Sequence, residues 1–253
     1  MPIANLKVSF ENLQEEPYAS IICYPQLVPG ELQKRLVELT KLGVTALESG
    51  GEKEVFGVKV LGKGCVGIVT TAYRNNEKVA LKIRRVDADR AQMQNEATLL
   101  KKANTLNVGP KFLAATRNFL LMQFVDGELI PEWLNKYRQK VVVENVLRDV
   151  LEQCWRLDKA GLDHGELSQA PKHIIVDKED VPFIVDFESA SLNRKPSNVT
   201  SICQFLFFSG LVGAETSEIL GKKNREQALE ALRNYKKVRT RDSFENILKV
   251  FGF

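Results

Sequence analysis

The sequence predicts an α+β protein built as two lobes, a small sheet-rich lobe followed by a helical one. Between Val55 and Arg85, alternating and β-branched runs indicate antiparallel strands. After Asp126, apolar residues recur at helical spacing over long segments. The length of 253 residues exceeds the common size of one compact domain, which favours two lobes over one.

These patterns divide the chain into an N-terminal α/β extension (1–52), a small antiparallel-sheet lobe (53–125) and a reduced helical lobe (126–253). The extension holds the apolar run SIICYP and a helix over ELQKRLVELTKLG, which Gly43 would end. It is too short to be an independent enzyme. We therefore expect it to pack on the small lobe or to contact a partner.

The composition is that of an ordinary soluble protein, with 44% hydrophobic and 27% charged residues. The net charge of +4 fits an anionic ligand but does not indicate nucleic acid. No apolar run reaches membrane-spanning length, and the first residues lack the pattern of a signal peptide. Four widely spaced cysteines without a CxxC pair predict neither a zinc site nor disulfides. We expect a cytoplasmic protein with no membrane association.

The small lobe begins with three predicted strands, VFGVKVLG, CVGIVTTAYR and EKVALKIRR, with NNE as a turn between the last two. A helix should follow from about Ala88 to Asn104, and then the strands KFLAATR and FLLMQFVD. In the helical lobe, PEWLNKYRQK and VVVENVLRDVLEQCWRLDKAGL predict helices, and HIIVD and VPFIVDF predict strands. Further helical segments are expected at 198–212, 214–234 and 240–251.

Gly62, Gly64 and Gly67 form the pattern GxGxxGxV between two predicted strands. Glycines allow a backbone to fold closely over phosphates and to turn its N–H groups toward them. They also permit an ordinary hairpin turn, so the pattern alone does not decide between the two. A dinucleotide-binding fingerprint requires a helix after the loop, and here a strand follows.

Lys82 stands in the apolar strand VALKI, and alternation places it on the same face as the small Ala80. Glu96 follows fourteen residues later, at the border of the apolar stripe of the next helix. Its carboxylate could reach the lysine and fix the ammonium group. The alternative is a solvated lysine and an ordinary surface glutamate.

In this order, the glycine pattern, VALK and the helix glutamate resemble the nucleotide-binding lobe of protein kinases of a small, atypical kind. The resemblance implies a glycine loop over ATP, Lys82 on the α- and β-phosphates and Glu96 positioning Lys82. The run LLMQFVDGE resembles the last strand and hinge, which offer backbone groups to adenine. The implied nucleotide-binding residues are Gly62, Gly64, Gly67, Val69, Ala80, Lys82, Glu96, Gln123 and Val125.

Two further runs, LDHGELSQAPKHIIV and VPFIVDFES, resemble a kinase catalytic loop and metal-binding segment. The pattern His-Gly-acid-Leu-Ser is similar to the short archaeal serine/threonine kinases, the RIO-type kinases and the small kinases of tRNA-modification complexes. The likeness covers roughly residues 55–210. It implies catalytic roles for Glu166, Lys82 and Asp186, with Asp186 chelating Mg²⁺ or Mn²⁺. It also implies that His164 packs to hold the loop.

Three positions depart from the family pattern. Glu166 replaces an aspartate, and its extra methylene displaces the carboxylate. Pro171 stands where the family has a metal-binding asparagine, and if the loop is expanded by two residues, His173 takes that place as a metal ligand or contacts phosphate or protein. Glu188 replaces a glycine. An alternative is that both histidines are core residues bonded to backbone.

Two functional classes remain open. The first is an ATP- and divalent-metal-dependent atypical serine/threonine kinase or weak ATPase that acts on an unknown protein substrate. The second is a pseudokinase that binds nucleotide and acts through a protein partner. Cys65, in the glycine loop, is either a modifiable thiol beside the phosphates or a small loop residue.

The segment after the metal-binding motif is short. Only SASLNRKPS separates Glu188 from Asn198, and no Ala-Pro-Glu follows, so we expect extended peptides to bind poorly. The next run has the spacing of a buried helix that Asn198 or Ser197 could cap.

Overall fold

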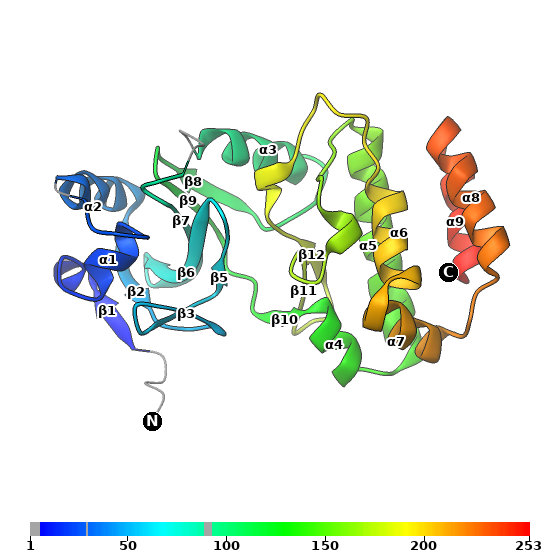
Figure 1. Ribbon diagram of the computed structural model, residues 1–253, viewed down its shortest axis with the longest axis horizontal. Coiled ribbons are helices and arrows are strands. Elements are labelled where there is room, and N and C mark those ends of the chain that lie inside the picture. The colour runs from blue at the N-terminus through cyan, green and yellow to red at the C-terminus, as the bar shows by residue number, and fades with distance from the viewer. Residues whose placement is uncertain (1–5, 29, 89–92) are drawn as a thin grey trace. The chain divides into compact units, whose positions relative to one another are not determined.

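The computed structural model describes residues 6–28, 30–88 and 93–253 and folds into two compact units (Figure 1). One unit combines Met1–Thr98 with Lys111–Phe124, and the other combines Leu99–Pro110 with Val125–Phe253. The first is built on an antiparallel sheet and the second is mainly helical, so the predicted α+β class is confirmed. Helix α3 (Gln94–Asn104) runs from the first unit into the second.

The strands of the sheet unit pair antiparallel throughout the described residues, as the alternating pattern predicts. The main sheet has the order β1 (Lys7–Ser9), β2 (Val44–Glu48), β6 (Gly67–Arg74), β7 (Glu77–Arg84), β9 (Phe119–Gln123) and β8 (Phe112–Ala115). β5 (Gly62–Lys63) also pairs with β6, and β3 (Lys53–Val55) forms a separate hairpin with β4 (Val58–Val60). The two longest strands, β6 and β7, carry the glycine pattern and the candidate lysine into the sheet.

Two hairpin turns depend on left-handed backbone. Asn75 and Asn76 have φ of 50° and 63°, so the predicted NNE turn is confirmed. The predicted single strand VFGVKVLG is wrong, because Phe56 (φ 52°) and Gly57 (φ 77°) fold it back into the β3–β4 hairpin. Period-2 alternation did not reveal that break, since a phenylalanine rarely occupies a left-handed position.

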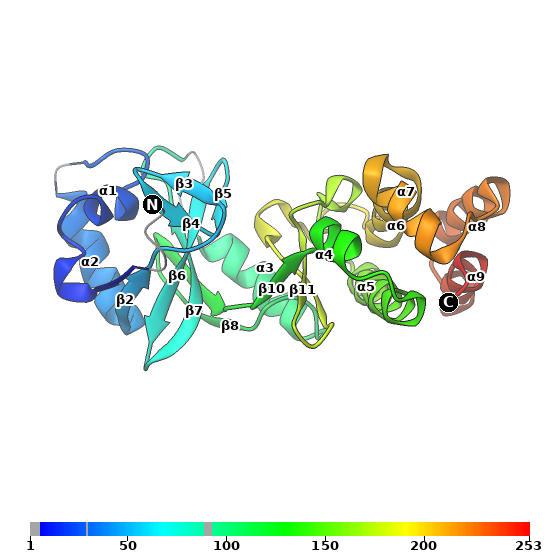
Figure 2. The ribbon, with the colours of Figure 1, turned by 90° about the horizontal axis from the view of Figure 1, so that it is seen from below.

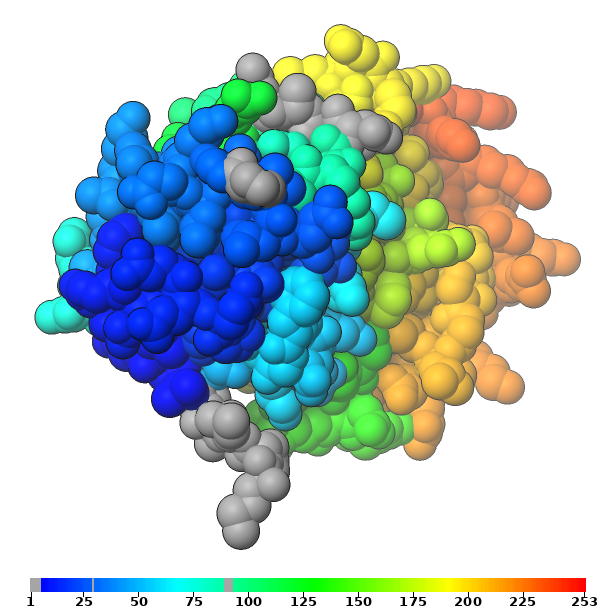
Figure 3. Space-filling model, turned by 60° about the vertical axis from the view of Figure 1, so that its left-hand side comes forward, coloured from blue at the N-terminus to red at the C-terminus, as the bar shows by residue number. Residues whose placement is uncertain are grey.

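The N-terminal segment is part of the sheet unit. β1 and β2 extend the sheet beside β6, and the chain between them forms the helices η1 (Phe10–Asn12), α1 (Tyr18–Ile22) and α2 (Glu31–Leu42). Gly43 ends α2 with φ of 72°, as predicted. Apolar residues of α1 and α2 share one core with those of β2, β6, β7 and β9. Figure 3 shows the described N-terminal residues in dark blue against the lighter blue and cyan residues of the sheet.

A fully buried arginine fixes α2 to the sheet. Arg35 donates hydrogen bonds to the carbonyl oxygens of Ile22 (2.8 Å) and Arg84 (2.7 Å) and to Oδ1 of Asn118 (3.2 Å). Its Nε also lies 3.1 Å from a carboxylate oxygen of Glu31, one turn earlier. The guanidinium thereby joins α1, α2, the end of β7 and the turn before β9.

Asn118 is the centre of this polar network. Its Oδ1 also accepts from Arg84 Nη2 (2.8 Å), and its backbone N–H and amide group donate to the carboxylate of Glu38 (2.9 and 2.6 Å). Burial, and then the positive charge of Arg35, lower the pKa of Arg84. Two buried guanidinium groups are therefore compensated by carboxylates of α2 and by one asparagine.

The helical unit contains a small sheet and a set of packed helices. β10 (Gly127–Leu129), β11 (Ile174–Asp177) and β12 (Pro182–Ile184) pair antiparallel, and Figure 2 shows α4 (Ile130–Lys136) beside β10 and β11. The other helices are α5 (Lys140–Lys159), α6 (Asn198–Phe208), α7 (Gly210–Leu220), α8 (Arg225–Val238) and α9 (Arg241–Phe251). Two short 3₁₀ helices, η2 (Leu167–Gln169) and η3 (Phe187–Ser189), lie in the loops around β11 and β12.

Several predicted helix limits need correction. The predicted 198–212 and 214–234 helices are instead α6, α7 and α8, because the chain bends by 76° at Ser209 and breaks again after Leu220. Ser209 has extended backbone, and Gly210 and Gly221 have positive φ. The described part of α3 begins at Gln94, and residues 89–92 of its predicted start lie outside the described residues.

No single helix in the described ranges is long and apolar enough to cross a bilayer, and α6 and α7 pass that test only as a bent pair.

Replacing Arg35 tests the network that holds α2. We expect Arg35→Met to lower the free energy of unfolding by about 3–5 kcal/mol, because it leaves buried acceptors and carboxylates without their cation. Lys34→Met, one residue away but exposed, is the matched control and should change it by less than about 0.5 kcal/mol. Urea denaturation measures both, and equal effects would contradict the role given to Arg35.

Candidate active site

The glycine pattern forms the tight β5–β6 turn of the sheet unit. Gly62 pairs with Val69, and the Gly64 N–H donates to the Gly67 carbonyl at 2.8 Å. A Cβ on Gly67 would lie 2.4 Å from the carbonyl oxygen of Ile83, so the packing of β7 requires glycine there.

Gly62 and Gly64 differ from Gly67 in this respect. A Cβ on either would meet its nearest neighbour at 3.6 Å or more, and neither has a positive φ. The fold therefore explains only one glycine of the pattern. The other two leave the backbone accessible for a ligand, as a phosphate-binding loop requires. Cys65 lies between them and Gly67 as an exposed free thiol.

Lys82 and Glu96 form a buried ion pair in the sheet unit. The side chains are almost inaccessible, with 4% and 6% of the two residues exposed, and Lys82 Nζ lies 2.9 Å from both carboxylate oxygens. Strand register places Lys82 opposite Val69, next to the glycine turn. The structure thus brings together the lysine and glutamate that the sequence singles out, and the solvated alternative is wrong for both.

Of the two predicted adenine contacts, Gln123 is the last residue of β9, whereas Val125 follows the strand and belongs to the helical unit. The backbone N–H of Gln123 donates to Lys111 at 2.8 Å, and its side-chain oxygen accepts from the Lys111 N–H. The backbone N–H of Gln123 is therefore already bonded within the sheet unit. A backbone donor to adenine on this segment would thus come from a later residue.

In the helical unit, the loop after α5 is organised around His164. This side chain is fully buried, and its Nε2 lies 3.0 Å from the carbonyl oxygen of Val185, to which it donates as the neutral ring. Burial, and then the nearby His173, lower the pKa of His164 to about 4. The ring also packs edge-on against Phe187. His164 therefore ties the loop to the residue directly before Asp186.

A buried carboxylate that sequence reasoning missed anchors the same loop. Asp158 accepts from the backbone N–H groups of Asn198 (2.8 Å) and Val199 (3.2 Å) and from the Tyr235 hydroxyl (2.9 Å). Asn198 in turn accepts from the His164 N–H at 2.8 Å. Asp158 thus caps α6 from a distance, and the predicted capping by the side chain of Ser197 or Asn198 is wrong.

A signal for Asp158 was present in the sequence. It lies four residues after Cys154, within the buried stripe of α5, where an unpartnered acid would be costly. Such a position indicates an internal partner, although the sequence does not say which one.

Asp186 occupies strained backbone at the end of β12. Its φ of 69° and ψ of 75° are left-handed, which an aspartate adopts only at a cost of roughly 1–3 kcal/mol. The following Phe187 is buried against Gly109, where a Cβ would lie 2.9 Å from the ring. The phenylalanine fixes the turn, and the partly buried Asp186 carboxylate presents hard oxygen ligands of the kind that Mg²⁺ and Mn²⁺ accept.

Glu166 is held from two sides. Ser189 donates a short hydrogen bond to Oε1, and His173 Nε2 lies 3.0 Å from Oε2, outside regular hydrogen-bond geometry. Burial raises the pKa of Glu166, but the Ser189 hydrogen bond and the His173 charge outweigh it, and the net pKa lies below its ordinary value. The side chain is therefore an ionised carboxylate that can accept a hydrogen bond from a hydroxyl group or water.

His173 is 1% exposed, and neither ring nitrogen has a regular hydrogen bond to any described residue. His173 therefore lies beside the carboxylate of Glu166, the residue for which the resemblance implies a catalytic role. Ser189 was not predicted, because nothing in the pattern DFES distinguishes its hydroxyl from that of a loop serine.

A family model for the RIO domain matches residues 69–201, which is more than half of the chain. The chain belongs to the RIO family. RIO domains are atypical kinase and ATPase domains, and the antiparallel sheet unit followed by a helical unit is consistent with their fold. The RIO match includes Lys82, Glu96, Glu166 and Asp186 but begins after Gly67. No curated protein matches the chain.

The low pKa of His164 makes the stability of this RIO-family chain depend on pH. The unfolded chain binds a proton near pH 6.5, whereas the folded protein does so only near pH 4. The free energy of unfolding should therefore fall as the pH drops through this window, by about 3 kcal/mol from this group.

Histidine NMR tests the assignment directly, because the chain has only two histidines. The His164 ring should stay neutral at pH 5, with His173→Gln used to assign the resonances. Titration of His164 near pH 6.5 would contradict the proposed burial.

Proposed function

We propose that this RIO-family chain is an ATP- and divalent-metal-dependent atypical serine/threonine kinase or weak ATPase. The observation that carries the proposal is the buried Lys82–Glu96 pair. Burying such a pair rarely adds stability over apolar residues, so its retention beside the glycine turn favours a functional role. An ammonium fixed by a carboxylate is suited to binding the α- and β-phosphates of ATP.

Within the sheet unit, the proposed nucleotide contacts are the glycine turn, Val69, Ala80 and Lys82, with Glu96 orienting the lysine. Ala80 lies on the same strand face as Lys82 and is small enough to leave room for the purine ring. The segment from Gln123 to Val125 would bond adenine through backbone groups. Since the Gln123 N–H is already used, we assign the donor role to a residue after it.

Within the helical unit, Asp186 would hold Mg²⁺ or Mn²⁺. When bound, the cation would neutralise charge on the phosphates. The sequence also suggests His173 as a metal ligand, and we now propose that it orients Glu166 instead. Imidazole is a poor ligand for hard Mg²⁺, and the His173 Nε2 lies 3.0 Å from a carboxylate oxygen of Glu166.

Glu166 would act as the base that orients the acceptor. Its lowered pKa makes it a weak proton acceptor, so we assign it mainly to aligning a hydroxyl group or a water molecule. Phosphoryl transfer relies chiefly on positioning and charge neutralisation, which an aligned carboxylate supports. Glu166 is longer than the aspartate of the family pattern, and the hydrogen bond from Ser189 would restrain this longer side chain.

A pseudokinase is the second candidate, because Pro171 stands where the family has a metal-ligating asparagine and His173, the substitute in an expanded loop, faces Glu166. In that case, nucleotide would act as a regulatory ligand, and the chain would exert its function by binding a protein partner.

Two carboxylate variants distinguish binding from chemistry. Asp186→Asn should weaken Mg²⁺·ATP binding about tenfold or more, because it removes the charge that holds the metal. Glu166→Gln should leave nucleotide affinity within about twofold and lower turnover by about a hundredfold, since it affects only the acceptor. Calorimetric titration and phosphate release measure the two effects.

Glu179→Gln, an exposed glutamate in the β11–β12 turn, is the matched control and should change neither quantity. If the native protein shifts its melting temperature with nucleotide but neither transfers nor hydrolyses phosphate with Mg²⁺ or Mn²⁺, the pseudokinase assignment replaces the enzyme.

Extended peptides should be poor substrates. Hydrogen bonds hold the segment between Ser189 and Asn198 against the loop after α5. Ser191 pairs with Asp163 through the backbone. Arg194 donates to the Asp163 carboxylate (2.9 Å) and to the Ser189 carbonyl oxygen (2.6 Å). A segment fixed in this way offers no platform for a peptide. Screening a degenerate serine/threonine peptide library should give no sequence-selective transfer, and robust selective transfer would contradict the assignment.

A further inference from the structure

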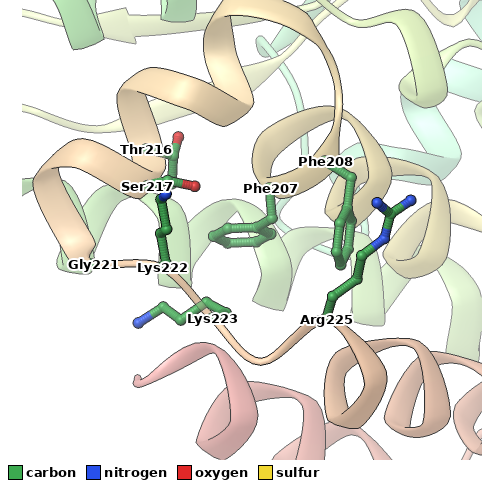
Figure 4. Close-up of a pocket in the computed structure, with 8 residues that line it drawn as sticks. All are labelled: Phe207, Phe208, Thr216, Ser217, Gly221, Lys222, Lys223 and Arg225. Atoms are coloured by element: carbon green, nitrogen blue, oxygen red, sulfur yellow. The ribbon is translucent and has the colours of Figure 1, made fainter.

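The hollow between the end of α6 and the start of α8 shows no built ligand site (Figure 4). The guanidinium group of Arg225 lies beyond Phe208, apart from the ammonium groups of Lys222 and Lys223. Arg225 and Lys222 are exposed, so water solvates both charges. A more specific arrangement lies in the sheet unit, where the N-terminal segment contacts the glycine turn.

Tyr24, in the N-terminal segment, packs beside the glycine turn and is 6% exposed. Lys63 belongs to the glycine pattern, and its Nζ lies 5.7 Å from the centre of the Tyr24 ring. The Cζ of Arg85 lies 5.1 Å from the same centre. Both distances fall within the range of cation–π attraction. The ring of Phe56, in the β3–β4 hairpin, packs edge-on against Tyr24 at 6.0 Å between centroids.

Backbone hydrogen bonds reinforce this contact. The N–H of Arg85 donates at 2.8 Å to the carbonyl oxygen of Val66, which lies inside the glycine pattern. The N–H of the next residue, Val86, donates at 2.8 Å to the carbonyl oxygen of Tyr24. The Arg85 guanidinium is also held by both carboxylate oxygens of Asp87, at 2.8 Å each. Arg85 and Val86 therefore join the turn to the N-terminal segment.

The N-terminal segment supports the turn on the sheet face opposite to Lys82. Residues directly opposite each other in an antiparallel pair share a face, and successive residues of a strand alternate between faces. Lys63 lies opposite Ile68, which belongs to the core shared with the N-terminal helices, whereas Val69 lies opposite Lys82. Tyr24 therefore does not compete with a ligand on the Lys82 face.

The glycine turn has little packing of its own to fix its conformation. A Cβ added to Gly62 or Gly64 would meet no atom closer than 3.6 Å. Glycine has more backbone freedom than other residues, so ordering such a turn over a phosphate costs conformational entropy. A support on the other face reduces this cost before the ligand arrives, and a pre-organised loop binds more tightly for that reason.

We propose that Tyr24 is a positioning residue for nucleotide binding, and that the N-terminal segment sets the nucleotide affinity by holding the glycine turn through this ring. The inference rests on the proposed function, since it concerns the same nucleotide. Tyr24 and Lys63 lie outside residues 69–201, which match the RIO domain, so the family match does not supply this support. Loss of the ring loosens the turn without replacing any residue of the nucleotide site.

Calorimetric titration of the full chain with Mg²⁺·ATP tests this role. Tyr24→Leu should weaken the affinity by about fivefold or more, because the unsupported turn must be ordered during binding. Tyr18→Leu is the matched control, since Tyr18 is also 6% exposed in the same core and its ring contacts no part of the glycine turn among the described residues. It should change the affinity by less than about twofold. Tyr24→Phe keeps the ring and should restore the native affinity.

Hydrogen exchange without nucleotide tests the support itself. The amides of Leu61 and Gly64 are the reporters, because their hydrogen bonds close the turn. They should exchange about fivefold or more faster in Tyr24→Leu than in Tyr18→Leu, since loss of the support favours local opening. The amides of β9 correct for global unfolding of the sheet unit. Arg85→Gln leaves the core filled and should accelerate exchange in the same direction by about twofold, because it removes one cation from the ring.

Equal exchange rates or equal ATP affinities in Tyr24→Leu and Tyr18→Leu would overturn the proposal. So would a Tyr24→Phe variant that behaves like Tyr24→Leu. If the native chain binds no ATP, the proposed function fails and the role in affinity fails with it. The exchange comparison uses no nucleotide, so it decides separately whether Tyr24 supports the turn.

Discussion

The helical unit depends on one buried carboxylate, that of Asp158. It accepts the first two N–H groups of α6 and the Tyr235 hydroxyl of α8, and the Asn198 side chain extends the network to the backbone of His164. Burial raises the pKa of Asp158, while these hydrogen bonds act against that rise. Without such partners an acid in the buried stripe of α5 would be strongly destabilising. Its partners therefore fix where α6, α8 and the loop with Glu166 can lie.

In the sheet unit, the buried guanidinium group of Arg35 has the role that the Asp158 carboxylate has in the helical unit, because it bonds to several elements at once. Arg35 is fully buried and bonds backbone oxygens at the ends of α1 and β7, while Asn118 joins it to Arg84. Each unit has one candidate segment of irregular backbone, the glycine turn and the loop with Glu166, and a buried polar network holds the backbone near each. Turns have few apolar contacts of their own, so directional hydrogen bonds determine their conformation. The backbone near the glycine turn and near the loop with Glu166 is thus held by residues that take no part in the proposed chemistry.

The elements and contacts that the sequence predicts correctly are those set by local periodicity. Alternation placed Lys82 on one strand face and helical spacing placed Glu96 at the border of the apolar stripe, so their contact was one of the two interpretations that the spacing allowed. The contacts of Ser189 and His173 with Glu166, and of Asp158 with Asn198, could not. Each joins residues from different loops or helices, and a local pattern carries no information on such pairings. The α6–α7 bend was missed because apolar spacing continues almost unbroken across Ser209.

Two departures from the family pattern, Glu166 and His173, are in direct contact in the structure, and Ser189 contacts Glu166 as well. A glutamate has one more rotatable bond than an aspartate, so an unrestrained Glu166 would lose more conformational entropy when aligning an acceptor. Ser189 reduces this cost because its hydrogen bond restrains one carboxylate oxygen, and the ring of His173 lies against the other, with Nε2 at 3.0 Å. Ser189 is positioned in turn by Arg194, which contacts its carbonyl and the Asp163 carboxylate. The longer acid, the histidine in the loop and the short pinned segment after Glu188 therefore support one another. Replacing Ser189, His173 or Arg194 would thus remove one contact that restrains Glu166 directly or through Ser189.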